Sequence, residues 1–297
     1  MNAASLKTVL GSYPHTMALK DGSVNHAAVM LDFQEVSPVH KAFAPMVRHE
    51  AYDLCELAIV TALQAVAYDR PVVLLPVVVA SRFQRGCLIA HGSRPIRPQD
   101  LPGKRVGVRA YTQTTGMWVR SHLVEDFGLD IGAIAWVTHD AAHVEQYTDP
   151  AFVHHDDGDK SLLDMLRDGD IDAAILGNDM PKGDEFRPVF DDANDRDLAW
   201  WRKHRFMPIN HMVAASRTVC ERNPAAIRAA YALLLEAADR MAGDPSGPLP
   251  FRFGIEGLRG PVEFTIDACM RQGLLPRRPT VDEVFAPARR ILDHGSD

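Results

Sequence analysis

The chain has 297 residues, 46% of them hydrophobic and 24% charged, which is the balance of a soluble globular protein with one large domain or two lobes. Its 32 basic and 39 acidic residues give a net charge of −7 and form no basic stripe, so nucleic acid is excluded as an expected partner. No apolar run approaches the roughly 20 residues of a membrane span, and no secretory signal pattern opens the chain. We expect a cytoplasmic protein with reduced thiols, because Cys55, Cys87, Cys220 and Cys269 form no C-x-x-C pair; removal of a leader is the alternative.

Apolar patterning in the first third of the chain alternates between strand and helix. Strands are predicted at 6–12, 29–36, 53–57 and 71–79, and helices at 38–49 and 61–68, with a short helix after Thr16 that ends at Leu19. The longest apolar run, at 71–80, is typical of a strand buried on both faces. This β-α-β-α-β order favours a mostly parallel sheet with helices on both faces.

The rest of the chain is predicted to form a second lobe and then to return to the first. A proline-rich crossing at 93–102 leads to strands at 105–109 and 134–138, a loop at 141–160, a helix-break-strand unit at 161–175 and a helix at 198–203. A strand at 208–215 returns to the first lobe, and helices follow at 224–241, 261–272 and 280–294, two of them beginning at a proline. The predicted lobes are 1–92 with 211–297, and 93–210.

The stretch 101–120 indicates a ligand site between such lobes. A short strand turns through Tyr111, Thr112, Thr114 and Thr115 directly into a helix. Backbone N–H groups at a helix start, together with the positive end of its dipole, suit a carboxylate or phosphate. An ordinary N-cap, in which the Thr side chains cap these groups, is the alternative.

Other candidate residues lie where strands end or pair. Glu56 sits among apolar residues near the end of its strand, so it is either paired structurally or functional. Arg82 and Arg85 follow the longest apolar strand, where a guanidinium could hold a carboxylate; surface solvation is the alternative for one of them. His211 lies inside the strand at 208–215 and is either structural or, facing a cleft, able to move a proton near neutrality.

Several familiar signatures are absent. The chain has no G-x-x-x-x-G-K-[ST], G-x-G-x-x-G, G-x-S-x-G or H-E-x-x-H motif, which argues against common nucleotide-binding, hydrolase and metalloprotease designs. The run His154-His155-Asp156-Asp157 contains metal-ligand side chains, but adjacent residues on a loop rarely converge on one ion. We expect a solvated loop there and no metal or cofactor.

The chain resembles the 4,5-dihydroxyphthalate decarboxylase family over most of residues 10–240. The resemblance rests on residues that occur in the same order and at similar spacing: Arg48-His49, Asp53, Glu56-Leu57, Ser81-Arg82-Phe83, 103–108, Tyr111, Thr114, Trp118, Met165-Leu166, Gly169, Ile171-Asp172-Ala173, Pro208-Ile209 and His211. It implies the type II periplasmic-binding-protein-like fold, an α/β architecture of two lobes with mixed, mostly parallel sheets and a central ligand cleft.

Three positions depart from the family pattern. His15 stands where the family has Arg, Gly86 where it has His, and Ala110 where it has Glu. Arg109, where the family tends to have Pro, is expected to supply a compensating positive charge. These replacements alter polar residues of the cleft, so the substrate is expected to differ from that of the family.

The favoured function is a cofactor-independent lyase that decarboxylates a hydroxylated aromatic (di)carboxylic acid. We expect His211 as proton donor and Glu56 as partner of a substrate hydroxyl. Substrate-binding residues are expected to be His15, Arg82, Arg85, Arg109, Tyr111, Thr112, Thr114 and Thr115. The alternative is a non-catalytic solute-binding protein for an aromatic or other small carboxylate. The expected partner is a small aromatic carboxylate, and we expect neither nucleic acid nor a membrane as a partner. The oligomeric state stays open, and a homo-oligomer is possible.

Overall fold

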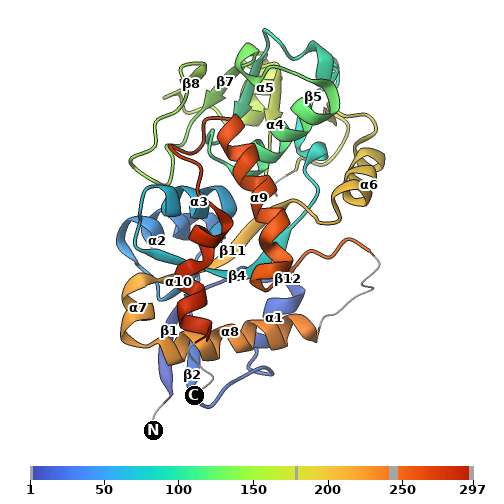
Figure 1. Cartoon of the computed structure of the whole chain (residues 1–297). Coiled ribbons are helices and arrows are strands. Elements are labelled where there is room, and N and C mark those ends of the chain that lie inside the picture. Colours follow the sequence, from blue (N-terminus) through green and yellow to red (C-terminus); the bar gives the residue numbers. More distant parts are fainter. Residues whose placement is uncertain (1–2, 178–179, 241–246, 294–297) are drawn as a thin grey trace.

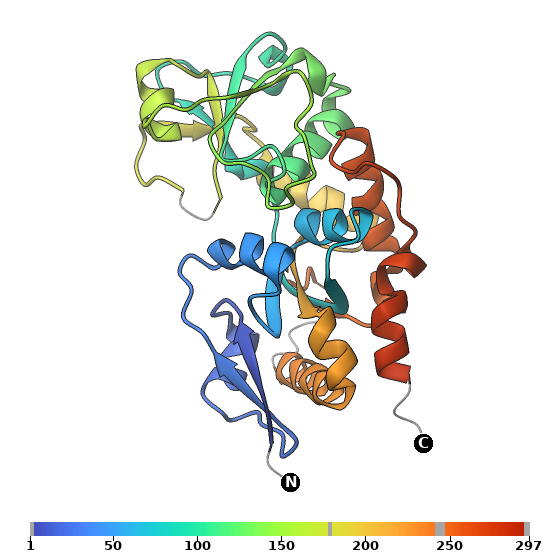
Figure 2. The same cartoon turned by 90° about the vertical axis from the view of Figure 1, so that its left-hand side faces the viewer.

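Two six-stranded sheets, one in each lobe, organise the chain (Figures 1 and 2). The structure is a computed structural model that describes residues 3–177, 180–240 and 247–293. The predicted helix ends at 241 and 294 lie outside these described residues. The α/β class and the two mixed sheets agree with the fold expected from the sequence.

The first sheet has the strand order β12-β4-β11-β3-β1-β2. Its strands are β1 (Ala4–Val9), β2 (Val29–Phe33), β3 (Leu54–Ala58), β4 (Val72–Ser81), β11 (Ile209–Ser216) and β12 (Arg252–Phe253). β1 pairs in parallel with β2 and β3, whereas β11 runs antiparallel between β3 and β4. The strand predicted at 208–215 therefore does return to the first lobe, and it lies at the centre of the sheet.

Helices cover both faces of this sheet because the side chains of β4 alternate between two cores. Leu74 and Val78 pack in one core, and Val73 and Val77 pack in the other. The first core contains side chains of α2 (Phe43–His49), α3 (Ile59–Ala67), α9 (Ile255–Arg271) and α10 (Val281–Asp293). The second contains side chains of α1 (Pro14–Lys20), α7 (Arg217–Arg222) and α8 (Pro224–Asp239).

The second sheet has the order β10-β5-β9-β6-β7-β8. Its strands are β5 (Leu88–His91), β6 (Arg105–Val108), β7 (Ala135–Thr138), β8 (Val153–His155), β9 (Ala173–Ile175) and β10 (Phe186–Pro188), and its helices are α4 (Thr114–Phe127), α5 (Leu162–Asp168) and α6 (Ala193–His204). The helix-break-strand unit at 161–175 is confirmed as α5, a left-handed Gly169 and β9. Gly107 in β6 permits close packing, since a Cβ there would lie 2.6 Å from Ile171 Cδ1 and 2.8 Å from Leu162 Cδ2.

Some details differ from the sequence predictions. Among the described strands, five pairs are parallel and five antiparallel, because β11 and β12 in the first sheet and β5 in the second run opposite to the other strands of their sheets. β5 already belongs to the second sheet, so the chain leaves the first sheet before the predicted boundary at residue 92. The segment 141–160 contains the edge strand β8 instead of being irregular throughout. Pro261 lies inside α9 and does not begin it.

The end of α9 joins the two lobes. It extends from the first lobe to the side of α4 (Figure 1). Just beyond it, Gln272 donates through Nε2 to the Met117 carbonyl at 2.9 Å and to Ser121 Oγ at 3.0 Å, both in α4. None of the helices in the described part of the chain combines the length and apolar character needed to span a membrane.

Candidate active site

A cavity of about 1020 Å³ lies between the lobes, and we call it the central cleft. The first lobe lines it with the segment after β1, the start of α3 and Arg82 beyond β4. The second lobe lines it with the start of α4 and the segments after β7 and β9. The carboxyl ends of several parallel strands thus meet at the cleft, which is the edge of an open α/β sheet where ligands bind.

The start of α4 faces the central cleft. Thr112, Gln113, Thr114 and Thr115 all line it. Within the described chain, the Gln113 side chain at the N-cap caps none of the first-turn N–H groups. The Thr115 hydroxyl instead accepts a hydrogen bond from Arg82 at 3.1 Å. The helix start therefore keeps its backbone donors and the positive end of its dipole for an anion.

Arg82 bridges the lobes at the cleft. In addition to its bond to Thr115, it donates through Nη1 to the Gly177 carbonyl of the second lobe at 3.2 Å. Its Nε is buried and has no hydrogen-bond partner among the described residues. The same holds for Oε1 of Gln113 nearby on the cleft wall. A ligand with both a carboxylate and a hydroxyl would satisfy this donor and this acceptor.

Arg109 adds a second cation to the cleft wall. Its Nε lies 3.3 Å from Oδ2 of Asp140, which also lines the cleft. The structure thus brings Arg109 together with Arg82, Thr112, Thr114 and Thr115 on the cleft wall, and substrate binding by these residues stays a prediction.

His211 and Glu56 form a buried pair at one end of the cleft. They are diagonal neighbours on one face of the sheet, because antiparallel pairing sets His211 opposite Ala58 and Glu56 opposite Val213. Nδ1 of His211 lies 2.5 Å from Oε1 of Glu56. His211 lines the cleft, whereas Glu56 is fully buried behind it. Glu56 therefore contacts His211, and the expected direct contact between Glu56 and a substrate hydroxyl is wrong.

Two further donors complete the surroundings of Glu56. The Tyr13 hydroxyl donates to Oε1 at 2.5 Å, and the Gly11 N–H donates to Oε2 at 2.6 Å. Burial favours a raised pKa for Glu56, but the hydrogen bond and charge of His211, with the bonds from Tyr13 and Gly11, outweigh it and lower the pKa. Burial and the charge of Glu56 raise the pKa of Tyr13, so its phenol stays protonated.

The ionised Glu56 fixes the orientation and tautomer of His211. Because Nδ1 faces the carboxylate, Nε2 is the ring nitrogen left for a ligand in the cleft. A carboxylate behind an imidazole also stabilises the imidazolium form. This arrangement is that of a general acid.

Besides His211, the cleft is lined by His40, His139 and His143, which sequence reasoning did not single out. His143 was missed because it lies in the segment predicted to be a surface loop. Arg48 of α2 donates to the carbonyls of Ala142 at 2.9 Å and His143 at 2.8 Å, which ties this loop to the first lobe. Nδ1 of His143 lies 2.8 Å from the Thr61 hydroxyl in α3. These bonds join residues more than 80 positions apart, so sequence proximity gave no signal.

Two of the histidines that line the cleft, His143 and His211, pack against Phe43. The ring centroids lie 5.7 Å apart for His143 and 5.2 Å apart for His211, each with an edge-on geometry. Burial, together with the charge of Arg109 and other nearby cations, lowers the pKa of His143 to about 3. His143 is therefore a neutral hydrogen-bonding group at physiological pH.

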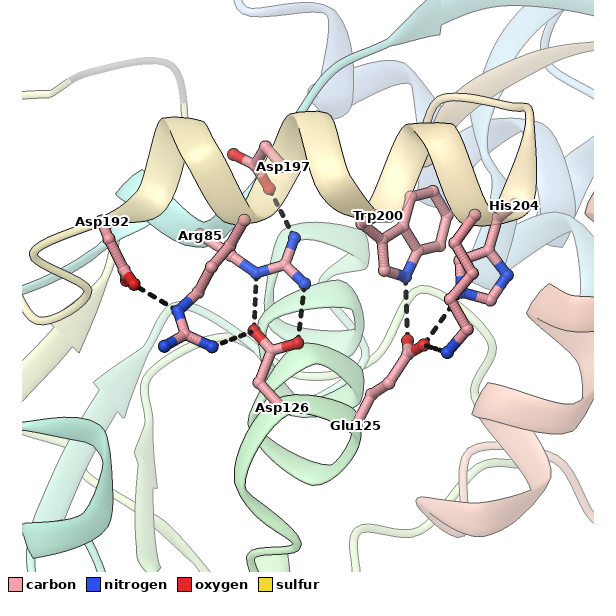
Figure 3. Close-up of polar contacts among 9 residues, drawn as sticks. Arg85, Glu125, Asp126, Asp192, Asp197, Trp200 and His204 are labelled. Carbon is pink, nitrogen blue, oxygen red and sulfur yellow. Dashed lines mark hydrogen bonds and ion pairs between the residues drawn. The ribbon is translucent and has the colours of Figure 1, made fainter.

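Arg85, predicted to bind substrate, instead forms a sealed ion cluster in the second lobe (Figure 3). Its Nε and Nη2 donate to Asp126 at 2.8 and 3.0 Å, and its Nη1 donates to Asp197 at 2.6 Å. Arg196 joins the cluster through a 2.7 Å bond to Asp192 and a 3.9 Å contact with Asp126. The guanidinium is fully buried, and each of its three nitrogens donates to a carboxylate, so it is not available to a ligand.

Tyr111 was also predicted to bind substrate, but the structure places it away from the cleft. Its ring is buried, with the Arg120 guanidinium 3.9 Å from the ring centroid, and its hydroxyl donates to the Gln272 carbonyl at 3.3 Å. It supports the junction between α4 and α9 and does not line the cleft.

The three positions that depart from the family pattern lie apart from the central cleft. His15 is buried in the wall of a second pocket adjoining it. Gly86 lies in the short helix η2 (Arg85–Cys87), and Ala110 is buried after β6. His154 is exposed on β8, and the described residues contain no group of three or more His, Cys, Asp or Glu that could hold a metal.

The chain is similar to two decarboxylases. No family model matches it. A 4,5-dihydroxyphthalate decarboxylase from Comamonas testosteroni is 27% identical over 238 residues, which cover 75% of this chain and 72% of the relative. Another from Pseudomonas putida is 30% identical over 184 residues, which cover 59% of this chain and 71% of the relative.

Solved structures share the fold. The periplasmic aliphatic sulphonate binding protein SsuA from Escherichia coli has a TM-score of 0.60 and 15% identity, covering 95% of this chain and 91% of its own. The alkanesulfonate-binding protein SsuA from Xanthomonas axonopodis pv. citri has a TM-score of 0.58 and 14% identity, covering 96% and 98%. The desulfurization enzyme DSZB has a TM-score of 0.57 and 16% identity, covering 98% of both chains. The fold is thus that of periplasmic binding proteins, and it occurs in both binding proteins and an enzyme.

Proposed function

Because the chain belongs to the 4,5-dihydroxyphthalate decarboxylase family, we propose that it is a carboxy-lyase acting on a hydroxylated aromatic carboxylic acid in aromatic-compound catabolism. The observation that carries this proposal is the His211–Glu56 pair, whose histidine opens into a cleft lined by cations and a helix start. The pair supplies a proton, and the cleft supplies an anion site.

The reaction consumes one proton at the ring carbon and needs neither an oxidant nor a reductant. When a ring hydroxyl lies ortho or para to the carboxylate, electron donation from its oxygen makes the carbon that bears the carboxylate basic. Nε2 of protonated His211 transfers a proton to that carbon and forms a dienone-like species. The carbon–carboxylate bond then breaks, CO2 leaves, and the electron pair restores the aromatic ring. Solvent returns the proton to His211, and Glu56 stays ionised throughout.

The cleft residues divide the remaining tasks. Arg82 and the start of α4 bind an anionic end of the substrate, such as a second carboxylate. Gln113 and His143 offer hydrogen bonds to ring hydroxyls. The departing carboxylate lies toward Phe43, whose apolar ring contacts His211 and disfavours a charged group relative to neutral CO2.

A solute-binding protein for an aromatic or other small carboxylate is the alternative. It is favoured by the binding proteins that share this fold, since fold alone does not fix function. A receptor would use Arg82 and the helix start in the same way, but it would have no need for a proton donor. The two proposals therefore differ in what His211 does.

The test is a thermal-shift screen of hydroxylated mono- and dicarboxylic aromatic acids, followed by measurement of CO2 release on the compounds that bind. A ligand at about a hundred times its dissociation constant adds roughly 2.7 kcal/mol to stability, which such a screen detects. We expect His211→Asn to lower turnover by roughly a hundredfold or more while ligand binding persists. His154→Asn, a matched change on exposed β8, should leave turnover unchanged. Binding without CO2 release in the wild type would favour the receptor.

A further inference from the structure

A second pocket of about 540 Å³ adjoins the central cleft. The two cavities share the walls formed by Tyr13, Arg82, Asn210 and His211. A ligand that reacts at His211 can therefore extend past Arg82 into the second pocket. An apolar cavity of about 150 Å³ is large enough to bind benzene, so the pocket has room for a ring with substituents.

The walls of the second pocket beyond the shared residues are mainly apolar. They come from Val79 and Ala80 at the end of β4 and from Pro248, Leu249 and Phe251 before β12. This lining suits an aromatic or aliphatic group and offers little to a charged one.

His15 provides one polar atom in this lining. It is buried, and its Nε2 has no hydrogen-bond partner among the described residues. Its ring stacks on Tyr13, with centroids 5.5 Å apart and planes within 6°, and lies 5.1 Å from Phe251. This packing fixes the imidazole against rotation.

His15 is a neutral acceptor. Burial lowers its pKa more than a hydrogen bond to the Val79 backbone raises it, so the ring is uncharged at neutral pH. Because Nε2 is the nitrogen without a partner, Nδ1–H is the group that donates the hydrogen bond to the Val79 carbonyl. Nε2 then carries the lone pair and lacks a donor. A ligand hydroxyl would supply that donor.

We propose that the second pocket is a substrate subsite for an apolar, ring-sized substituent that carries a hydroxyl, which donates to Nε2 of His15. The inference rests on the proposed function, since it makes the substrate an aryl-substituted hydroxy acid larger than a single ring. The carboxylated ring occupies the central cleft beside His211, and the substituent lies between His15 and Leu249.

Three related acids test the subsite by isothermal titration calorimetry. They are a hydroxyphthalate with its hydroxyl para to one carboxylate, the same acid with a phenyl substituent, and the same acid with a hydroxyphenyl substituent. For the wild type we expect the phenyl group to tighten binding by tenfold or more. The added hydroxyl should tighten it by a further factor of about 2 to 10, the range for one neutral hydrogen bond.

Two variants separate the contributions. His15→Phe keeps a ring between Tyr13 and Phe251 but removes Nε2, so the gain from the hydroxyl should disappear while a gain from the phenyl group remains. Leu249→Trp fills the pocket from its surface loop, so the gain from the phenyl group should disappear. His154→Phe on exposed β8 is the matched control and should leave all three affinities at wild-type values. Thermal unfolding of each variant verifies that it is folded.

The outcomes distinguish the subsite from the decarboxylase proposal. If the substituents add no affinity in the wild type, or if folded His15→Phe keeps the gain from the hydroxyl, the subsite is wrong even where CO2 is released. If affinities follow the expected pattern without CO2 release, the subsite stands and the decarboxylase proposal fails. If none of the three acids binds, both fail.

Discussion

Replacing Glu56 with Gln tests whether the buried carboxylate serves His211. Three donors face its two oxygens: the Gly11 N–H at 2.6 Å, the Tyr13 hydroxyl at 2.5 Å and Nδ1 of His211 at 2.5 Å. A carboxamide keeps the size but presents an NH2 group in place of one acceptor, so at least one donor loses its partner. A buried donor without a hydrogen-bond acceptor lowers the unfolding free energy by roughly 1–3 kcal/mol.

The same substitution should lower turnover more than it lowers stability. Without the negative charge, Nδ1 of His211 loses its carboxylate partner, and the ring orientation that turns Nε2 toward the cleft is no longer fixed. We expect kcat to fall by roughly 10²–10⁴-fold, the contribution typical of positioned general acids. Binding of the aromatic acid at Arg82 should persist, because Glu56 is buried behind His211 and does not line the cleft.

The pH dependence of stability gives an independent measurement. The pKa of Glu56 is lowered in the folded protein, whereas an unfolded Glu titrates near about 4.3. The stabilisation from the carboxylate is therefore complete above that value and is lost as the pH falls through the folded pKa. The difference in unfolding free energy between wild type and Glu56→Gln should be constant from about pH 5 to 7 and shrink below about pH 4.

Urea unfolding across this pH series and CO2 release at neutral pH are the assays. A stability gap that stays constant down to about pH 3 would show that the pKa of Glu56 is not lowered in the folded protein, and a gap that grows as the pH falls from about 7 to 5 would show that Glu56 is protonated there. Unchanged turnover in Glu56→Gln would show that the carboxylate has no part in the proton transfer. Either result refutes the reasoning that joins Glu56 to His211.

Two further predictions concern the cleft wall. Arg82→Ala should weaken binding of an aromatic carboxylate by about ten- to a hundredfold in calorimetry, because a charge-assisted hydrogen bond contributes roughly 1.5–3 kcal/mol; an unchanged dissociation constant removes Arg82 from the site. His143→Phe should keep the packing against Phe43 but raise KM for hydroxylated acids by a factor of about 2 to 10, the range for one neutral hydrogen bond. Its effect should not vary between about pH 5 and 8, because the pKa of His143 is about 3, and an effect that follows a titration in this range would contradict the neutral role.

The long apolar elements were predictable because local pattern determines them. The run at 71–80 is rich in β-branched valines and forms the buried strand β4, and the Gly169 break in 161–175 ends α5 before β9. Short strands were not predictable: β8 has three residues and an exposed histidine pair, so no period is visible over its length. Pro261 was read as a helix start, but α9 begins six residues earlier and continues through it.

The site was predictable only where strand geometry brings residues together. Glu56 and His211 could be expected near one another once β3 and β11 were placed in one lobe. Arg82 and Arg85 lie three residues apart after the same strand, and nothing local distinguishes them. The distinction comes from Asp126 and Asp197, which lie 41 and 112 positions from Arg85 and bind its guanidinium. His143 was missed for the same reason, since its partners come from distant helices.

Arg85 and His211 show how the same kind of buried ion pair serves different ends. Around Arg85 the carboxylates of Asp126 and Asp197 satisfy the guanidinium, and the cluster is closed; around Glu56 one member, His211, has a second nitrogen at the cleft. Arg85→Met leaves two buried carboxylates without their cation and should lower the unfolding free energy in urea by about 3–5 kcal/mol, with no change in ligand affinity. Arg196→Met, a matched change at the partly exposed edge of the cluster, should lower it by about 1 kcal/mol or less. Ligand affinity should not change, because the guanidinium of Arg85 is buried among carboxylates and does not contact the cleft. A folded Arg85→Met protein that no longer binds aromatic acids would contradict this and would place Arg85 in the substrate site.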